Sequence, residues 1–211
     1  MDNDLLPLFP LEVVLLPEEE LPLHIFEERY KTMIGECLEA KAAGKGEFGV
    51  VLAKGQELSS TGCTARITNV LRQYEDGRMD ILTVGRRRFE VLLTNDEQPY
   101  LRAAVDFFED DTPEAPSEAV EATAQLFRDA MTKLHRPGEQ EFHLPRPYGQ
   151  VSFRLAALLP LDLAFKQRLL ALRSEPERLA LVHRALEVFL QQLARTQECQ
   201  TKAGGNGHAR H

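Results

Sequence analysis

The dipeptide Asp76-Gly77 separates two β-prone runs in the segment ARITNVLRQYEDGRMDILTV, and this pattern restricts the middle of the chain to a β-hairpin. Asp-Gly is suited to the positive φ angles of a two-residue hairpin turn. Glu75 and Arg78 would then flank the turn as a cross-strand ion pair. The first half of the chain is therefore predicted to be rich in β structure.

Both faces of the second run are partly apolar. Met79 and Ile81 point to one side of the strand, whereas Leu82 and Val84 point to the other. A further short apolar run, FGVVLA at residues 48–53, reads as a buried strand. Strands that are covered on both sides favour a compact barrel or sandwich over a flat open sheet.

One helix interrupts this β region early, in the segment IFEERYKTMIGECLEAKAAG. Its apolar residues recur at helical spacing, and Gly44 follows them where a C-terminal cap is wanted. The predicted stripe consists of Phe26, Tyr30, Met33 or Ile34, Cys37 and Leu38. We expect an amphipathic helix that lies over the sheet.

The composition changes at the acidic, proline-bearing segment EDDTPEAPSEA, where the apolar period switches from 2 to 3.6. Ser117 and Asp162 are expected to cap helices, and Ser174 with Glu177 to form a capping box before the last one. With the boundary near Asp111, residues 1–111 form a predicted β-rich subdomain and residues 112–200 a helical subdomain. Residues 201–211 lack an apolar face and are predicted to be a disordered tail.

Composition and charge limit the classes of function. No apolar run approaches the roughly 20 residues that a membrane helix needs, and Asp2 and Asp4 occupy the region where a signal peptide is basic. The three cysteines are far apart and predict neither a disulfide framework nor a thiolate zinc site. We expect a cytoplasmic protein that does not contact a membrane.

Motifs for cofactors or catalysis are weak. Gly44, Gly46 and Gly49 match G-x-G-x-x-G, but a helix precedes them and a strand follows, the reverse of a dinucleotide-binding unit. His24, Glu27 and Glu28 have the i, i+3, i+4 spacing that could bring metal ligands to one helix face, but a third and fourth ligand are not evident. The sequence also lacks a phosphate-binding P-loop and a recognisable serine nucleophile motif. We expect no cofactor, no metal and no catalysis.

Three consecutive arginines stand in the run TVGRRRFEV. Strand alternation predicts that Arg86 and Arg88 share one face and that Arg87 lies on the other. Without interleaved aromatic residues, and in an acidic half-chain that repels phosphate, nucleic-acid binding is not expected. The arginines are interpreted as solvated or ion-paired strand residues. In a sharper hypothesis, one of them pairs with a carboxylate or a backbone carbonyl and fixes the β-rich and helical parts together.

Several short segments form a set that covers nearly the whole chain: LPLFPLEVVLLPEEELPLHIFEERYKTMI, FGVVL, GCTARI, DGRMDILTVGRRRFEV, PYLRAAV and LPLDLAFKQRLLAL. The set resembles the N-terminal (LON) domain of the ATP-dependent Lon protease, which is also found in cereblon and in stand-alone bacterial proteins. The resemblance implies an α+β fold, with a β-rich PUA-like pseudo-barrel, one covering helix and a small C-terminal helical bundle. The family's opening usually has a glycine after the proline of its second apolar run, whereas Pro17 is followed here by three glutamates.

The resemblance implies that the chain binds unfolded polypeptide or a protein partner. The chain contains no Walker motif and no peptidase segment, so ATP or peptide hydrolysis is not implied. The candidate contacts are Phe9, Pro10, Leu11, Pro22, His24, Phe26, Arg86, Arg87 and Arg88. Packing within the core or between the two parts is the alternative role for each of them. RNA binding is the alternative function, because PUA-like barrels also occur in RNA-binding proteins, and a small hydrolase is a third possibility.

Overall fold

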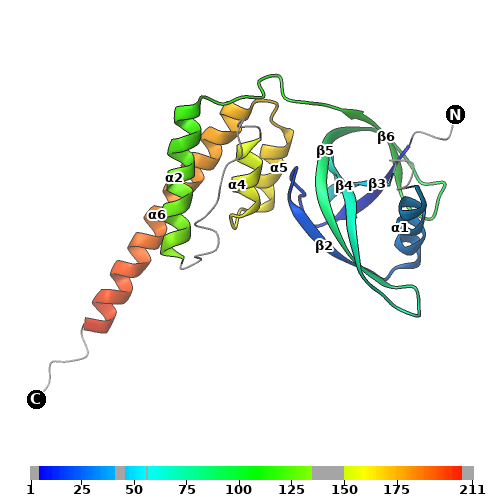
Figure 1. The fold of residues 1–211 in the computed structure, drawn as a ribbon, viewed down its shortest axis with the longest axis horizontal. Helices are drawn as coiled ribbons and strands as arrows, with labels where there is room; N and C mark the ends of the chain where they lie inside the picture. The colour runs from blue at the N-terminus through cyan, green and yellow to red at the C-terminus, as the bar shows by residue number, and fades with distance from the viewer. Residues whose placement is uncertain (1–4, 41–45, 56, 135–149, 206–211) are drawn as a thin grey trace, which may run out of the picture. The chain divides into compact units, whose positions relative to one another are not determined.

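The computed structural model describes residues 5–40, 46–55, 57–134 and 150–205 (Figure 1). The chain forms two compact units. The first contains Met1–Asp110 together with Ala156–Arg173, and the second contains Asp111–Leu155 together with Ser174–His211. This division differs from the single boundary predicted near Asp111, because a helical segment from the second half belongs to the β-rich unit.

The first unit is built on a six-stranded sheet in the order β2-β5-β4-β3-β1-β6. The strands are β1 (Leu6–Leu11), β2 (Glu20–Ile25), β3 (Glu47–Lys54), β4 (Glu57–Gln73), β5 (Met79–Asn95) and β6 (Arg102–Phe107). An additional pairing between β5 and β6 closes five of the strands into a barrel (Figure 1). The sixth strand, β2, pairs with the first half of β5 and lies at the end of the sheet. The predicted α+β fold with a pseudo-barrel is confirmed.

Phe89 fills the interior of the barrel and is fully buried. Gly49 and Gly62 lie beside its ring, and a Cβ atom at either position would come within 2.6 or 2.5 Å of Phe89 Cζ. Glycine is therefore needed at both positions, because no side chain fits between the strands and this ring. Leu8, Val51 and Ala103 complete this part of the core.

The β4–β5 hairpin is present, but its turn is longer than the two residues predicted. Residues 74–78 connect the strands, and Gly77 has a φ of +81°. The Gly77 N–H donates to the Tyr74 carbonyl at 3.0 Å. In this longer turn Arg78 Nε donates to Asp76 Oδ2 at 2.7 Å. The predicted ion pair between Glu75 and Arg78 is therefore wrong.

The helix α1 (Glu28–Ala40) buries Tyr30, Met33, Ile34 and Cys37, which confirms most of the predicted stripe. Phe26 is an exception: it precedes the helix and its residue surface is 59% exposed. The helix packs on the barrel through Tyr30, whose ring centroid lies 4.0 Å from that of Phe9. Gly44, the predicted cap, lies outside the described residues.

The helix α5 (Leu163–Ala171) also belongs to the first unit. Asp162 caps it as predicted, since its side chain accepts a hydrogen bond from the Phe165 N–H at 2.8 Å. Gln167 Nε2 donates to the Thr61 carbonyl on β4 at 2.9 Å. Lys166 pairs with Glu19 at 2.6 Å. These polar contacts connect α5 to the barrel strands and to the segment that precedes β2.

The second unit contains α2 (Ser117–Lys133), most of α4 (Val151–Ala157) and α6 (Glu175–Gly205). The packing of α2 on α6 buries apolar residues from both helices, namely Val120, Ala124, Phe127, Met131, Leu179, Val182 and Leu186. No helix in the described ranges has the length and apolar character required to cross a membrane.

The helix ends in this unit follow the sequence only in part. Pro116, not Ser117, occupies the N-cap of α2, because the fixed φ of proline (here −55°) suits the entrance to a helix. The predicted box at Ser174 is supported by a hydrogen bond of 3.4 Å from the Glu177 N–H to Ser174 Oγ. The helix α6 continues through Gly205, five residues into the predicted tail, since an established helix extends with little further cost per residue. Residues 206–211 lie outside the described residues.

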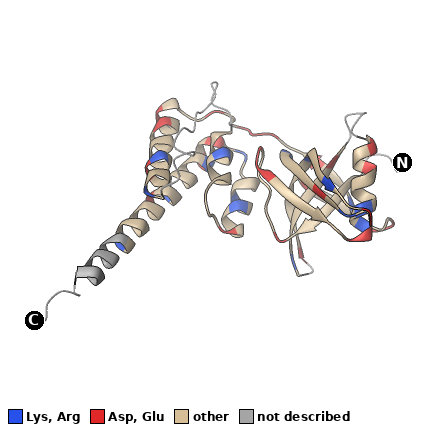
Figure 2. Ribbon diagram, turned by 60° about the horizontal axis from the view of Figure 1, so that its bottom comes forward, with Lys and Arg blue, Asp and Glu red and all other residues tan. Residues whose placement is uncertain are grey.

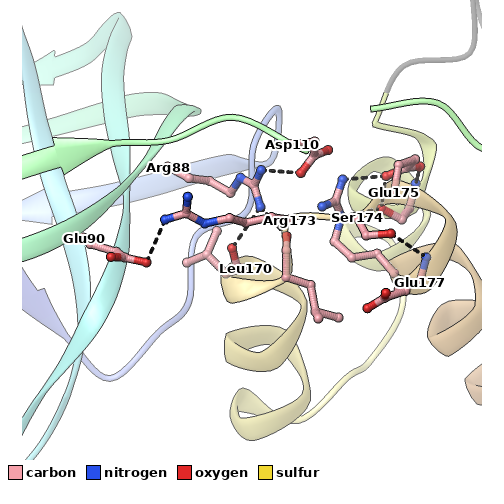
Figure 3. A network of polar contacts seen from close by, with 11 residues as sticks. Arg88, Glu90, Asp110, Leu170, Arg173, Ser174, Glu175 and Glu177 are labelled. Atoms are coloured by element: carbon pink, nitrogen blue, oxygen red, sulfur yellow. Dashed lines mark hydrogen bonds and ion pairs between the residues drawn. The ribbon is translucent and has the colours of Figure 1, made fainter. Parts of the chain in front are cut away.

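A buried polar group stabilises the start of α6. Arg178 Nη2 donates to Glu175 Oε2 at 2.7 Å, and Ser152 Oγ donates to the same carboxylate oxygen at 2.6 Å. All three residues are almost fully buried. The Arg178 guanidinium also lies 4.2 Å from the Phe153 ring centroid. Figure 3 shows the side chain of Glu175 within this group.

Candidate functional site

The first three predicted contact residues lie in β1, inside the sheet. Phe9 is 6% exposed and packs between Tyr30 and Phe48. Pro10 and Leu11 are half-buried and pair with β3. β1 has a neighbouring strand on each side, β3 and β6, so its backbone is enclosed by the sheet. These residues occupy positions suited to packing.

Pro22, His24 and Phe26 lie instead on an exposed surface at β2. The His24 ring stacks on Phe26 with the centroids 5.9 Å apart. Tyr74, in the β4–β5 turn, meets the His24 ring edge-on at 6.0 Å. We call His24, Phe26 and Tyr74 the aromatic cluster. The structure thus brings three residues from two distant segments of the chain onto one surface.

Asp80 on β5 holds the aromatic cluster in place. His24 Nδ1 lies 2.5 Å from Asp80 Oδ1, and the Tyr74 hydroxyl donates to Asp80 Oδ2 at 2.8 Å. The register explains this contact, since His24 lies directly opposite Asp80 in the β2–β5 pairing. The hydrogen bonds from His24 and then Tyr74 lower the pKa of Asp80 below its usual value. The carboxylate is therefore ionised at neutral pH and fixes both rings.

Two arginines flank the Tyr74 ring. The guanidinium carbons of Arg72 and Arg78 lie 4.5 and 5.0 Å from the ring centroid. Such cation–π contacts hold a half-buried ring in one orientation. Val70 and Leu71, on the same strand as Arg72, are also exposed. The aromatic cluster therefore combines the exposed apolar ring of Phe26 with two rings whose polar atoms are fixed by Asp80.

The three arginines do not follow the predicted alternation. Arg88 pairs with Cys63 and Gly85 pairs with Ala65, so β5 advances three residues while β4 advances two. This β-bulge adds a residue to β5 and breaks the alternation of faces. Arg86 and Arg87 are consequently both exposed, whereas Arg88 is 3% exposed. The prediction that Arg86 and Arg88 share a face is wrong.

Arg88 makes the structural contacts that the sharper hypothesis expected of one arginine. Its Nη1 donates to the carbonyl oxygens of Leu170 at 3.2 Å and Leu172 at 2.5 Å, and its Nη2 donates to Asp110 Oδ1 at 2.5 Å (Figure 3). The ring centroid of Phe108 lies 4.6 Å from the guanidinium carbon. A cation at the end of α5 satisfies helix carbonyls that have no partner within the helix. Pairing of one arginine with a carboxylate and backbone carbonyls is confirmed.

The exposed basic residues nearby have acidic neighbours. Arg87 Nη2 lies 3.6 Å from Glu47 Oε2, and Arg66 Nη2 lies 2.9 Å from Glu47 Oε1. Arg173 pairs with Glu90 at 3.1 Å (Figure 3). Figure 2 shows acidic and basic residues interspersed along the strands and α1 of the first unit. This mixture is unlike the single-sign surface that tracks a phosphate backbone.

The groups considered for metal binding or nucleophilic chemistry are not arranged for it. His24 lies on β2 and Glu28 begins α1, so they do not share a helix face. Within residues 5–40, 46–55, 57–134 and 150–205, no group of three or more His, Cys, Asp and Glu residues is placed to hold a metal ion. Cys37 and Cys63 are buried, and burial raises the pKa of each thiol to about 12. Both thiols are therefore protonated and weakly nucleophilic.

Sequence reasoning missed Tyr74 and Asp80. Both stand beside the Asp76-Gly77 turn, and a tyrosine next to a hairpin turn carries no signal of its own. The informative relationship is the pairing of β2 with β5, which joins residues more than fifty positions apart. Only the three-dimensional structure reveals that pairing.

Comparison with known proteins identifies the family. Residues 5–188 match the model of the ATP-dependent protease La (LON) substrate-binding domain. The chain belongs to this family. Among solved structures, a Lon N-terminal domain protein from Xanthomonas campestris is 27% identical with a TM-score of 0.63, over 85% of this chain and 97% of the other. The N-terminal domain of a Mycobacterium avium complex Lon protease is 17% identical, and its TM-score of 0.68 over 87% of this chain and 98% of the other shows a shared fold.

The LON-domain chain is also similar to complete proteases over part of their length. The Lon protease of Flavobacterium johnsoniae is 25% identical over 93% of this chain and 26% of the protease. The Lon protease of Parabacteroides distasonis is 29% identical over 63% of this chain and 16% of the protease. The chain thus spans about a quarter or less of the length of these relatives.

Proposed function

We propose that this LON-domain chain binds unfolded polypeptide at the aromatic cluster and the adjoining surface of β2, and that it does so without hydrolysing its ligand. The observation that carries the proposal is the aromatic cluster, in which His24 and Phe26 are exposed and Tyr74 is half-buried. Two of these rings, those of His24 and Tyr74, are held by the Asp80 carboxylate. Aromatic rings that are fixed before binding lose little conformational entropy when they contact a ligand.

The chemistry of the surface suits polypeptides of varied sequence. Phe26 offers an apolar ring, whereas His24 and Tyr74 combine an aromatic body with a polar tip. A mixed surface of this kind accepts aliphatic and aromatic side chains without requiring one particular residue.

Family membership supports the same proposal, since the matching model describes a substrate-binding domain. The Lon proteases of Flavobacterium johnsoniae and Parabacteroides distasonis are matched by this chain over 26% and 16% of their length. The sequence contains no P-loop motif, and the buried thiols of Cys37 and Cys63 are poor nucleophiles. These features favour recognition over catalysis. The two free thiols also suit the reducing environment of the cytoplasm, where we place the protein.

The proposal is tested with fluorescein-labelled casein, an unfolded polypeptide, by fluorescence anisotropy. Phe26→Ser removes an exposed ring and should weaken binding roughly tenfold, which corresponds to about 1.4 kcal/mol. Leu93→Ser is the matched control, because Leu93 is 72% exposed on the far half of β5, away from β2. The control should bind casein as the parent does.

The same samples report on hydrolysis. Casein should remain intact during prolonged incubation with the parent, with or without ATP. Absence of casein binding by the parent, or equal losses in the two variants, would contradict a polypeptide-binding role for the aromatic cluster. Cleavage of casein by an activity that co-purifies with the chain would contradict the non-catalytic part of the proposal.

A further inference from the structure

The strand β2 is an edge of the sheet. In the described part of the chain it pairs with β5 alone, through an uninterrupted antiparallel register from Glu20 opposite Val84 to Ile25 opposite Met79. The other five strands complete the barrel, in which each strand has a neighbour on both sides. One side of β2 is therefore not paired with any described strand. An edge of this kind can form a backbone ladder with another chain.

The hydrogen-bonding pattern shows which backbone groups point outward. The Gly85 N–H donates to the Glu19 carbonyl at 2.9 Å, and Thr83 Oγ1 donates to the Leu21 carbonyl at 2.8 Å. In an antiparallel pair, alternate residues direct both of their backbone groups toward the partner strand. The backbone N–H and C=O groups of Leu21 and Leu23 therefore point toward β5, as the Glu19 carbonyl does. The backbone groups of the alternate residues, at positions 20, 22 and 24, face away from β5.

We propose that an extended polypeptide segment adds to this edge as a further strand beside β2. The inference rests on the proposed function and names its mode of binding. The outward backbone groups supply affinity that does not depend on sequence, as in other cases of strand addition. The same residues place the side chains of Pro22 and His24 on the exposed face, beside the aromatic cluster. An added strand would thus pair with the β2 backbone while its side chains contact the aromatic rings.

Charge and polarity define the segment that fits. Leu21 and Leu23 are half-buried and leave apolar surface on the other face of the edge. Glu20 is exposed at the start of β2. The complementary ligand is an extended apolar segment with a basic residue at the end that lies beside Glu20. Short segments of this composition are exposed when a protein unfolds and are buried when it folds.

Pro22 keeps the edge from becoming a general template for aggregation. Proline has no N–H, so the outward ladder offers donors at Glu20 and His24 but only a carbonyl at Pro22. Natural proteins use proline and charged residues on edge strands to prevent pairing between copies. An interrupted ladder suits reversible binding of a ligand strand.

The test uses a fluorescein-labelled peptide of alternating valine and threonine with lysine at one end. One isomer carries N-methyl groups on its valines and a second carries the same number on its threonines. In an antiparallel added strand, residues whose N–H groups face β2 also direct their side chains to the face of the aromatic cluster. The apolar valine side chains are expected to contact the aromatic rings, so the valine N–H groups face β2. Methylation of the valines should therefore weaken binding about tenfold or more relative to methylation of the threonines, and a tenfold change corresponds to about 1.4 kcal/mol.

A pair of protein variants tests the same edge from the other side. Glu20→Pro removes an outward N–H, and Glu20→Gln removes the charge but retains that N–H. Strand addition predicts weaker peptide binding by Glu20→Pro than by Glu20→Gln at equal melting temperature. If Glu20→Pro does not fold, the comparison of the two methylated peptides still decides the question.

The outcomes separate this inference from the proposed function. Equal binding of the two methylated isomers would overturn strand addition. Binding of casein that depends on Phe26 but is accompanied by no binding of the unmethylated peptide would overturn it as well, and both results leave the proposed function in place. If neither casein nor the unmethylated peptide binds the parent, the proposed function itself is contradicted. A dimer of the chain that is lost in Glu20→Pro would assign the edge to a second copy and overturn the ligand proposed here.

Discussion

The Arg88 guanidinium donates to the Asp110 carboxylate at 2.5 Å, and both side chains are almost completely excluded from solvent. The same guanidinium binds two carbonyl oxygens at the end of α5. One residue of the barrel therefore holds both the segment that leaves β6 and the helix that returns to the unit from the second half of the chain. Its neighbours Arg86 and Arg87 are exposed, so the three arginines have different roles.

The first prediction is that the three arginines contribute unequally to stability. Arg88→Ala should lower the free energy of unfolding by about 3–5 kcal/mol, because it leaves the Asp110 carboxylate in a buried site without the Arg88 charge. Arg86→Ala should change it by less than about 0.5 kcal/mol, as is usual for an exposed residue. Urea unfolding of the single variants provides the measurement. Equal effects at the two positions would contradict the bulged geometry of β5.

The second prediction concerns RNA. Charges of both signs are interspersed around Arg87, and Glu47 accepts contacts from two arginines. We expect no measurable binding of single-stranded RNA at physiological salt, since phosphate recognition requires a surface on which basic residues predominate. Filter binding across a salt series checks this expectation. Salt-dependent affinity that is lost in Arg86→Ala/Arg87→Ala, at unchanged stability, would favour the RNA-binding alternative.

Local patterns were sufficient to predict much of the fold. The Asp76-Gly77 hairpin and the buried stripe of α1 both follow from side-chain spacing within one element, and the cap at Asp162 follows from residue type. Each depends on interactions between residues that are close in the sequence. The β-bulge at Arg86 and Arg87 does not, because it is fixed by how β5 pairs with β4. Strand alternation alone therefore misplaced the buried arginine.

For the candidate surface, the sequence indicated some of the residues but not how they are arranged in space. The sequence indicated His24 and Phe26, but Tyr74 and Asp80 join them through the β2–β5 register. A register between distant strands depends on the closure of the whole sheet, which no local pattern encodes. For the same reason, the sequence did not indicate that α5 packs with the barrel unit.

The third prediction concerns the loop before β2, where the family usually has a glycine. Glu18 occupies this place with a φ of +63°, and its N–H donates to the Gly85 carbonyl at 2.8 Å. A left-handed conformation costs a non-glycine residue about 1–2 kcal/mol, which is partly offset by the greater flexibility of glycine in the unfolded chain. Glu18→Gly should therefore stabilise the protein by about 0.5–1 kcal/mol in urea unfolding. Glu20→Gly, within β2, is the control and should destabilise it, so stabilisation by both changes would contradict the conformational explanation.

The fourth prediction concerns Asp80 and pH. Hydrogen bonds from His24 and Tyr74 lower the pKa of Asp80 in the folded protein below its usual value of 3.8. A carboxyl group whose pKa is lower in the folded state stabilises the protein above its unfolded pKa, and this stabilisation disappears as the pH falls through the folded pKa. Asp80→Asn should therefore melt below the parent at neutral pH, and the difference should shrink as the pH falls below 3.8.

Thermal melts of the parent and Asp80→Asn over this pH range measure the effect. Asp96→Asn is a suitable control, since Asp96 is an exposed carboxylate in the β5–β6 connection and lies away from the aromatic cluster. Loss of the Asp80 hydrogen bonds should also free the His24 and Tyr74 rings and weaken casein binding by the same variant at neutral pH. A difference in melting temperature that is independent of pH, together with unchanged casein binding, would show that the Asp80 carboxylate does not hold the aromatic cluster.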